Sequence, residues 1–128
     1  MHFEHAGMNV ADPVAMAHWY VANLGLRIVV EQDTSPYMHF LADATGRVIF
    51  ELYSNPSAPL PDYAHQDPLV LHLAFAVDDM DITKDRLLAA GATQISDNTQ
   101  PNGTRLAMLR DPWGVALQLA ARGVPLGS

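Results

Sequence analysis

The sequence predicts an α+β fold made of two tandem βαβββ modules, and three observations support this prediction. The segment from His5 to Asp12 aligns with the segment from His72 to Asp79, so the chain repeats itself with an offset of 67 residues (5 to 72). A pattern typical of a short helix follows each of these segments. Three strand-like runs then follow each helix.

In the first half, a strand is expected at residues 3–10, before a helix from Pro13 to Leu24. Gly25 should end this helix, because glycine readily adopts the left-handed conformation that follows many helix C-termini. Strand-like composition predicts three further strands, separated by turns rich in Asp, Ser, Pro and Gly, at residues 26–31, 37–42 and 47–53.

The second half repeats this order, with a strand at residues 70–77 and a helix from Met80 to Ala90 that ends at Gly91. Its remaining strands are expected at residues 93–96, 104–110 and 115–120. Residues 54–68 are rich in Pro, Ser and Asn and are predicted to be a linker. The single domain would then contain one module at about residues 3–53 and a second at about residues 69–121.

The size of each module predicts how the modules assemble. A lone module of about 60 residues buries only a modest core and is marginally stable. A helix covers one face of each sheet, so the other face needs a partner. We therefore expect the two sheets to join into one curved sheet, and the chain to form a homodimer that buries the remaining apolar surface.

Composition excludes several classes of function. The net charge is −7 and no basic face is visible, which argues against binding to nucleic acid or to an anionic membrane. The absence of cysteine excludes disulfides, thiolate zinc sites and a cysteine nucleophile, and it fits a reducing cytoplasm. No signal peptide and no membrane span is predicted. These features favour a cytoplasmic protein that acts on a small molecule.

Four polar side chains stand out when the strands are divided into their two faces. Side chains alternate across a strand. We compare the two faces of four strands, the first, fourth, fifth and last. In three of these four strands, all side chains on one face are apolar and suited to packing against a helix. The opposite face carries small residues and a single strong donor per strand, and these donors are His5, Glu51, His72 and Gln118.

The spacing of these donors predicts a metal site. The same 46 positions separate His5 from Glu51 and His72 from Gln118 (5 to 51 and 72 to 118). A lone histidine is usually structural, and that interpretation is kept for His2 at the start of the chain, His18 on the first helix and His65 in the linker. Two imidazoles, a carboxylate and an amide oxygen can hold Zn²⁺, Ni²⁺, Mn²⁺, Co²⁺ or Fe²⁺ and leave positions open for two neighbouring substrate oxygens.

The same residues resemble the vicinal oxygen chelate superfamily, which includes glyoxalases, bleomycin-resistance proteins and ring-cleaving dioxygenases. The resemblance runs from about residue 3 to residue 121 and rests on six motifs in the right order. These are His5-Ala-Gly-Met-Asn-Val-Ala-Asp12, Trp19-Tyr-Val-Ala-Asn-Leu-Gly-Leu26, Phe50-Glu-Leu52, His72-Leu-Ala-Phe-Ala-Val-Asp-Asp79, Leu88-Ala-Ala-Gly-Ala92 and Arg110-Asp-Pro-Trp-Gly-Val-Ala-Leu-Gln-Leu119.

The resemblance implies an open half-barrel cup around the metal, with sites shared across a dimer. One site would take His5 and Glu51 from one subunit and His72 and Gln118 from the other. Glyoxalase I and its close relatives have a glutamate base on the last strand, whereas Gln118 cannot take a proton. By internal symmetry, the catalytic base would be Glu51, because a ligating carboxylate can detach and accept a proton.

Three functions remain open at this point. The first is a divalent-metal-dependent lyase or isomerase of the glyoxalase type, acting on a small substrate that chelates the metal through vicinal oxygens. The second is a non-haem iron dioxygenase, since two histidines and one carboxylate suit Fe²⁺. The third is a metal-free protein that binds a drug or metabolite. Five further side chains are candidate substrate contacts: Asn9, His39, Tyr53, Arg105 and Met108.

Overall fold

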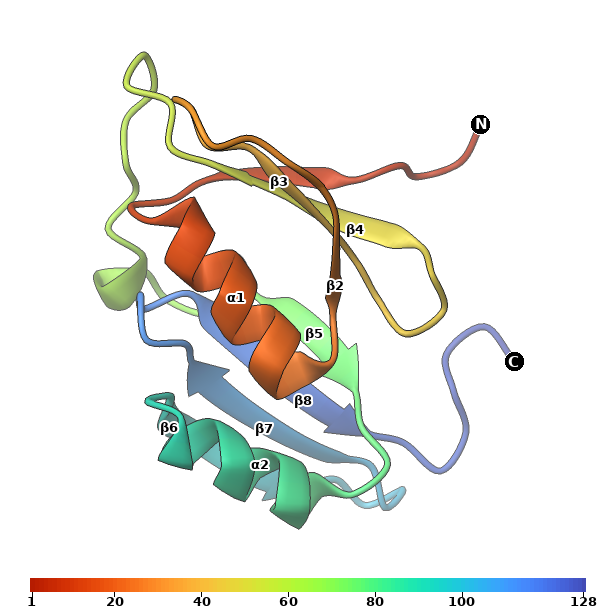
Figure 1. Ribbon diagram of the computed structural model, residues 1–128. Coiled ribbons are helices and arrows are strands. Elements are labelled where there is room, and N and C mark those ends of the chain that lie inside the picture. Colours follow the sequence, from red (N-terminus) through yellow and green to blue (C-terminus); the bar gives the residue numbers. More distant parts are fainter. The chain divides into compact units, whose positions relative to one another are not determined.

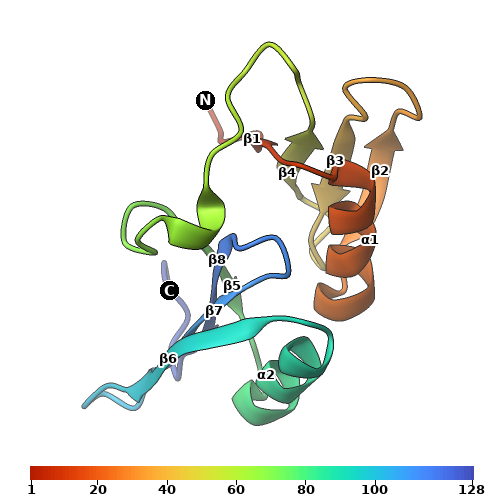
Figure 2. The ribbon, with the colours of Figure 1, turned by 90° about the vertical axis from the view of Figure 1, so that its left-hand side faces the viewer.

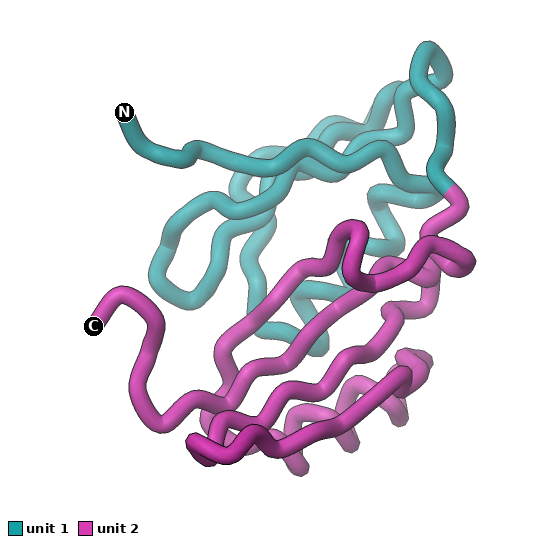
Figure 3. Tube along the Cα trace, turned by 180° about the vertical axis from the view of Figure 1, so that it is seen from behind, with its two compact units in different colours: residues 1–61 teal, residues 62–128 magenta.

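The computed structural model describes residues 1–128 and divides into two compact units, Met1–Pro61 and Asp62–Ser128 (Figure 3). Each unit contains one α-helix and one four-stranded mixed sheet (Figure 1). The predicted α+β class with two βαβββ modules is thereby confirmed. The boundary between the units falls within residues 54–68, and this stretch also contains a short 3₁₀ helix, η1 (Tyr63–His65), that the sequence did not predict.

The first unit has its strands in the order β1-β4-β3-β2. The outer strand β1 runs parallel to β4, and the other neighbours are antiparallel. In chain order, the elements are β1 (Ala6–Asn9), α1 (Pro13–Leu24), β2 (Arg27–Glu31), β3 (His39–Ala42) and β4 (Val48–Tyr53). The helix has the bounds that the sequence predicted.

Local chemistry explains the bounds of α1. The Asp12 carboxylate accepts a hydrogen bond from the backbone NH of Ala15 at 3.0 Å, and Pro13 occupies the first turn, where no NH is needed. The helix ends at Gly25, whose φ of 68° is left-handed. Tyr20 is fully buried and its ring lies edge-on to Phe50, with centroids 6.0 Å apart, so the helix packs on the β4 face that carries Phe50.

The second unit repeats this topology with the order β5-β8-β7-β6, in which β5 runs parallel to β8 (Figure 2). Its elements are β5 (Leu73–Ala76), α2 (Met80–Ala89), β6 (Thr93–Thr99), β7 (Arg105–Arg110) and β8 (Ala116–Ala121). Asp79 caps α2 by accepting from the NH of Ile82 at 3.0 Å. The helix buries Met80 and Leu87.

Some strand bounds differ from the prediction. β6 continues to Thr99 rather than ending at Ser96, because Asn98 and Thr99 pair with the start of β7. β1 and β5 are shorter than expected, so His5 and His72 each lie one residue before a strand. Neither helix is long and apolar enough to cross a membrane.

Candidate metal centre

Glu51 lies on the bare face of the first unit's sheet. It pairs with Gly7 on β1 and with Phe40 on β3, and so it faces away from Phe50 and Leu52, which lie on the helix side. Its side chain is half-buried and makes no hydrogen bond or ion pair. A carboxylate that is partly desolvated and lacks a protein partner remains available for a ligand.

His5 approaches the same face from the residue before β1. Its ring lies edge-on to Phe40, the neighbour of Glu51, with centroids 5.1 Å apart. Its Nδ1 is buried without a hydrogen bond, and the carboxylate of Glu4 lies 3.5 Å away. An unsatisfied buried imidazole nitrogen is costly, so this ring suits a ligand that completes its coordination.

Gln118 holds the matching position in the second unit. It pairs with Ala74 on β5 and Met108 on β7, as Glu51 pairs with Gly7 and Phe40. Its amide makes no hydrogen bond within the protein and is half-buried. The two oxygen donors thus occupy equivalent strand positions, beside a glycine in one unit and an alanine in the other.

The ring of His72 has a defined orientation. Its Nδ1 lies 2.8 Å from the carbonyl oxygen of Pro68. Because a carbonyl oxygen can only accept, Nδ1 must carry the proton, and the lone pair of the neutral ring is then on Nε2. Metal-binding histidines commonly hold their second nitrogen in this way.

Each unit therefore carries one of the predicted histidine ligands and one of the predicted oxygen donors. No group of three or more His, Asp or Glu side chains in the structure is placed to hold a metal ion. The sequence predicts that His5 and Glu51, together with His72 and Gln118, form a four-donor set. The chemistry of these donors fits a divalent cation such as Zn²⁺ or Fe²⁺.

Two of the five predicted substrate contacts lie beside these donors. The ring of Tyr53 crosses Gly7, where an added Cβ would lie 3.2 Å from the Tyr53 hydroxyl, so Gly7 makes room for this tyrosine. Met108 is buried next to Gln118. Phe40 belongs to the same surroundings and was not predicted, although strand alternation from its neighbours places it on the bare face.

Asn9 serves a different purpose. Its amide NH₂ lies within 3.4 Å of three carbonyl oxygens, those of Asn55, Ala58 and Pro59. Its side-chain oxygen accepts from the NH of Asn55 at 2.8 Å. Asn9 therefore holds the loop that follows β4.

His39 and Arg105 lie on the helix faces of their sheets, not beside the donors. His39 is 1% exposed, shares its face with Leu41, and has its Nδ1 2.7 Å from the carbonyl oxygen of Tyr37. Arg105 binds both carboxylate oxygens of Asp97, at 2.9 and 2.8 Å. Hydrogen bonds from Arg105 and Lys84 hold the pKa of Asp97 well below its usual range.

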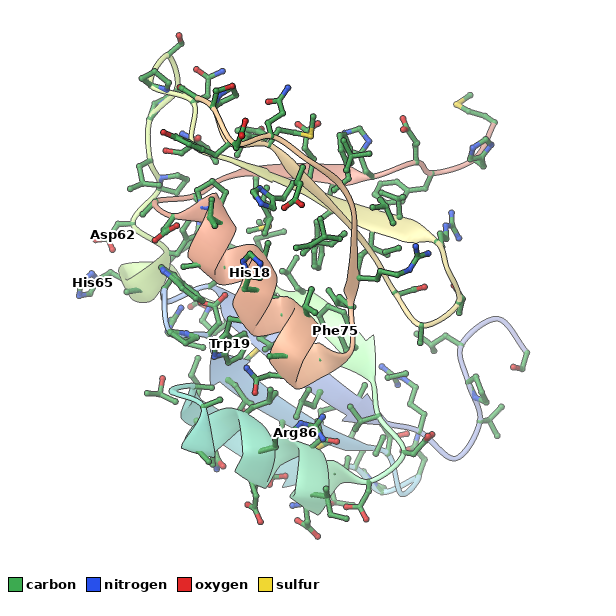
Figure 4. All side chains as sticks on the ribbon, in the orientation of Figure 1. His18, Trp19, Asp62, His65, Phe75 and Arg86 are labelled. Carbon is green, nitrogen blue, oxygen red and sulfur yellow. The ribbon has the colours of Figure 1, made fainter.

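The remaining histidines are on the surface (Figure 4). His18 lies on α1 beside Trp19, and its Nδ1 donates to the carbonyl of Val14 at 2.8 Å. His65 lies on η1, where its ring contacts the carboxylate of Asp62 at 2.9 Å. Neither lies beside the candidate donors on a sheet face.

Comparison with known proteins gives a consistent family and fold. The family model described as Glyoxalase/Bleomycin resistance protein/Dioxygenase superfamily matches residues 2–119. No curated protein sequence matches the chain.

Several solved structures share the fold. TnmS3, an antibiotic binding protein from Streptomyces sp. CB03234, is 21% identical with a TM-score of 0.72, over 96% of this chain and 97% of that one. A glyoxalase-related enzyme from Fulvimarina pelagi is 19% identical with a TM-score of 0.73, over 100% and 94%. A glyoxalase I mutant from Zea mays is 21% identical with a TM-score of 0.74, and the match covers 96% of this chain but 45% of that longer chain.

Proposed function

The chain belongs to the glyoxalase/bleomycin resistance protein/dioxygenase superfamily, and on that premise we propose that it is a divalent-metal-dependent lyase or isomerase. Its substrate would be a small molecule that chelates the metal through two neighbouring oxygens. The observation that carries the proposal is the equivalent placement of Glu51 and Gln118. Each pairs with a small residue of the neighbouring edge strand, β1 or β5, and a histidine lies one residue before that edge strand.

The proposed site takes one pair of donors from each kind of unit, His5 with Glu51 and His72 with Gln118. We propose that the two pairs come from different subunits of a dimer. The bound ion would polarise a substrate carbonyl and stabilise negative charge that develops on its oxygen. The imidazoles and the Gln118 amide hold the site together and take no proton during the reaction.

Glu51 is the proposed catalytic base. It is the only one of the four donors that can accept a proton while the imidazoles are occupied. It would remove a proton from the carbon next to the substrate carbonyl and return it to the adjacent carbon. The Tyr53 side chain follows two residues further along β4 on the same face, and its hydroxyl would donate a hydrogen bond to the substrate.

One experiment tests metal dependence and the base together. Protein purified without added metal is analysed for metal content, and Glu51→Gln is compared with the wild type on α-ketoaldehyde–thiol adducts and α-hydroxy ketones. The variant keeps an oxygen ligand, so it should retain the metal and lose turnover by roughly 10²-fold, as expected for removal of a general base. Gln118→Glu serves as the matched exchange and should keep the metal.

A metal-free binding function is the second candidate, and the apolar neighbours of the donors favour it. Phe40 and Tyr53 flank Glu51, and Met108 flanks Gln118, so each bare face offers apolar contact area to a ligand. TnmS3, which has the same fold, is described as an antibiotic binding protein. Wild-type protein that carries no metal and takes up none, but binds a small aromatic ligand, would establish this function in place of the enzyme.

A further inference from the structure

Arg110, at the end of β7, binds three backbone carbonyl groups. Its Nη1 donates to Tyr63 at 2.9 Å and to Gly114 at 3.1 Å, and its Nη2 donates to Gln66 at 2.8 Å. The side chain is half-buried and forms no ion pair with a carboxylate. A planar guanidinium that donates to both ends of residues 63–66 and to the β7–β8 turn fixes the course of this loop against the turn.

The β7–β8 turn holds the same loop at a second point. Gly114 has a φ of 89°, and a Cβ added to it would lie 2.7 Å from the backbone of Ala64. The buried carboxylate of Asp111 braces this turn by accepting from the NH groups of Trp113 and Val115, at 2.9 and 3.0 Å. Residues 63–66 are thus held by a guanidinium and by a close backbone contact.

The held loop leads directly to His72. The next residue, Asp67, organises a turn, since its carboxylate accepts from the NH of Leu69 at 2.8 Å and its carbonyl accepts from the NH of Val70 at 2.9 Å. Pro68 lies inside this turn, and its carbonyl oxygen accepts from His72 Nδ1 at 2.8 Å. Any shift of residues 63–66 would therefore move the group that orients the His72 ring.

The first unit makes the matching turn without such an arginine. There the carboxylate of Asp43 accepts from the NH groups of Thr45 and Arg47, at 2.9 and 3.3 Å, as Asp111 does in the second unit. The residue before Asp43 is Ala42, whereas the residue before Asp111 is Arg110. The fold of the module therefore does not need the arginine. The first unit lacks it, and in that unit the Nδ1 of His5 has no hydrogen bond.

We propose that Arg110 is a positioning residue for His72. Arg110 fixes residues 63–66 and thereby holds the Pro68 carbonyl in place. The hydrogen bond to this carbonyl keeps the proton of the His72 ring on Nδ1 and leaves Nε2 free to act as a ligand. The inference deepens the proposed function and rests on it, because a fixed Nε2 matters for function only if His72 binds a metal.

The ring of His72 can be observed without any metal. In ¹⁵N-labelled metal-free protein at about pH 8, where an ordinary imidazole is neutral, long-range ¹H–¹⁵N spectra report which nitrogen carries the proton. The His72 signal is assigned by its loss in His72→Ala. We expect a single Nδ1–H tautomer in the wild type, and a mixture of tautomers in Arg110→Met.

Zn²⁺ titration gives the second readout. Arg110→Met should bind Zn²⁺ roughly 10-fold more weakly or worse, because the Pro68 carbonyl that orients the ligating His72 is then no longer held in place. Arg110→Lys should recover only part of this loss, because one ammonium group cannot replace a planar fork that reaches three carbonyls. Arg122→Met removes an arginine from the same unit that makes no hydrogen bond or ion pair, and it should leave both readouts unchanged.

The two readouts separate failure of this inference from failure of the proposed function. Circular dichroism checks folding, and Gly114→Ala, which displaces Ala64 without a change of charge, should change the His72 tautomers as Arg110→Met does. An unchanged His72 tautomer in folded Arg110→Met or Gly114→Ala would overturn the positioning role. A wild-type protein that binds no Zn²⁺ or other divalent metal would refute the proposed metal site instead, and the tautomer comparison would still decide whether Arg110 orients the ring.

Discussion

The surroundings of each histidine decide what its ring can do. The Nδ1 atoms of His18, His39 and His72 all lie within 2.8 Å of a backbone carbonyl oxygen, so the hydrogen bond alone does not mark a ligand. The exposed His18 lies on a helix, and His39 is buried on a helix-covered face. His72 is half-buried and lies one residue before β5, where strand alternation assigns it to the same face as Ala74 and its neighbour Gln118. Position on a face, and not residue type, therefore separates a candidate ligand from a structural histidine.

Removal of either predicted imidazole ligand should weaken metal binding. His5→Ala and His72→Ala each remove an inner donor, so we expect each to lower the affinity for Zn²⁺ or Co²⁺ by at least about 10²-fold, which corresponds to about 2.7 kcal/mol. Calorimetric titration of the metal-stripped protein with Zn²⁺ or Co²⁺ measures this affinity. The matched control is His18→Ala, which removes an imidazole from the surface of α1 and should bind metal like the wild type. Equal affinity in all three variants would refute the assignment of the site.

The two helices are attached to their sheets by different interactions. α1 buries Met16, Ala17 and Tyr20, so apolar packing holds it. α2 is more polar, and charged groups supplement its buried Met80 and Leu87. Lys84 donates to Asp97 on β6 at 2.6 Å, and Arg105 on β7 bridges Asp97 and Asp81 at 2.8 and 2.9 Å. Asp97 therefore connects α2 to two strands.

Asp97→Asn should destabilise the protein in a pH-dependent way. The amide keeps the shape of Asp97 but loses its charge, and we expect a loss of about 1–2 kcal/mol in the free energy of unfolding at neutral pH, because the network is partly solvated. The pKa of Asp97 is lowered in the folded state, so its stabilising effect is present above the unfolded-state pKa near 3.9 and declines as the pH falls below it.

Urea denaturation of the wild type and the variant, from about pH 7 to pH 3, measures this difference. The gap between the two proteins should be largest at neutral pH and should shrink toward the acid end. Asp85→Asn is the control, because Asp85 is an exposed carboxylate on the same helix with no hydrogen bond or ion pair. A gap between Asp97→Asn and the wild type that stays constant across this range would show that the carboxylate charge does not stabilise the fold.

At the scale of the whole molecule, each unit carries half of the predicted donors and leaves strand edges and apolar side chains unpartnered within its own sheet. β1 and β5 each lie at the edge of a four-stranded sheet. Just before β5, Leu69, Val70 and Leu71 are 83%, 67% and 53% exposed. Contiguous exposed apolar side chains of this kind commonly mark an association surface.

We therefore expect the protein to form a homodimer. Light scattering across about 1 to 100 μM protein should give twice the 14.0 kDa mass of the chain. Val70→Glu introduces a charge into the exposed apolar run and should shift the equilibrium toward the monomer, whereas the surface variant His18→Ala should not. A wild-type protein that stays monomeric across this range would rule out the dimer, and with it the sharing of sites between subunits.

The sequence by itself determined the repeat and the order of elements, and it singled out the candidate donors. Asp12, Pro13 and Gly25 are local signals that act within a few residues, and so the bounds of α1 could be predicted without any tertiary contact. Alternation along a strand likewise placed Glu51 and Gln118 opposite the apolar faces, and strand pairing agrees. Metal binding by these residues stays a prediction.

Only the tertiary structure decided which polar side chains are already engaged and by what. Asn9, His39 and Arg105 are residue types that often occur in binding sites, but each is engaged elsewhere in the fold. Asn9 binds the loop after β4, His39 binds the turn before β3, and Arg105 binds the carboxylate of Asp97. Arg110 and its three carbonyl partners were likewise invisible in the sequence, because a hydrogen bond to backbone depends on where the chain passes and not on which residue passes there.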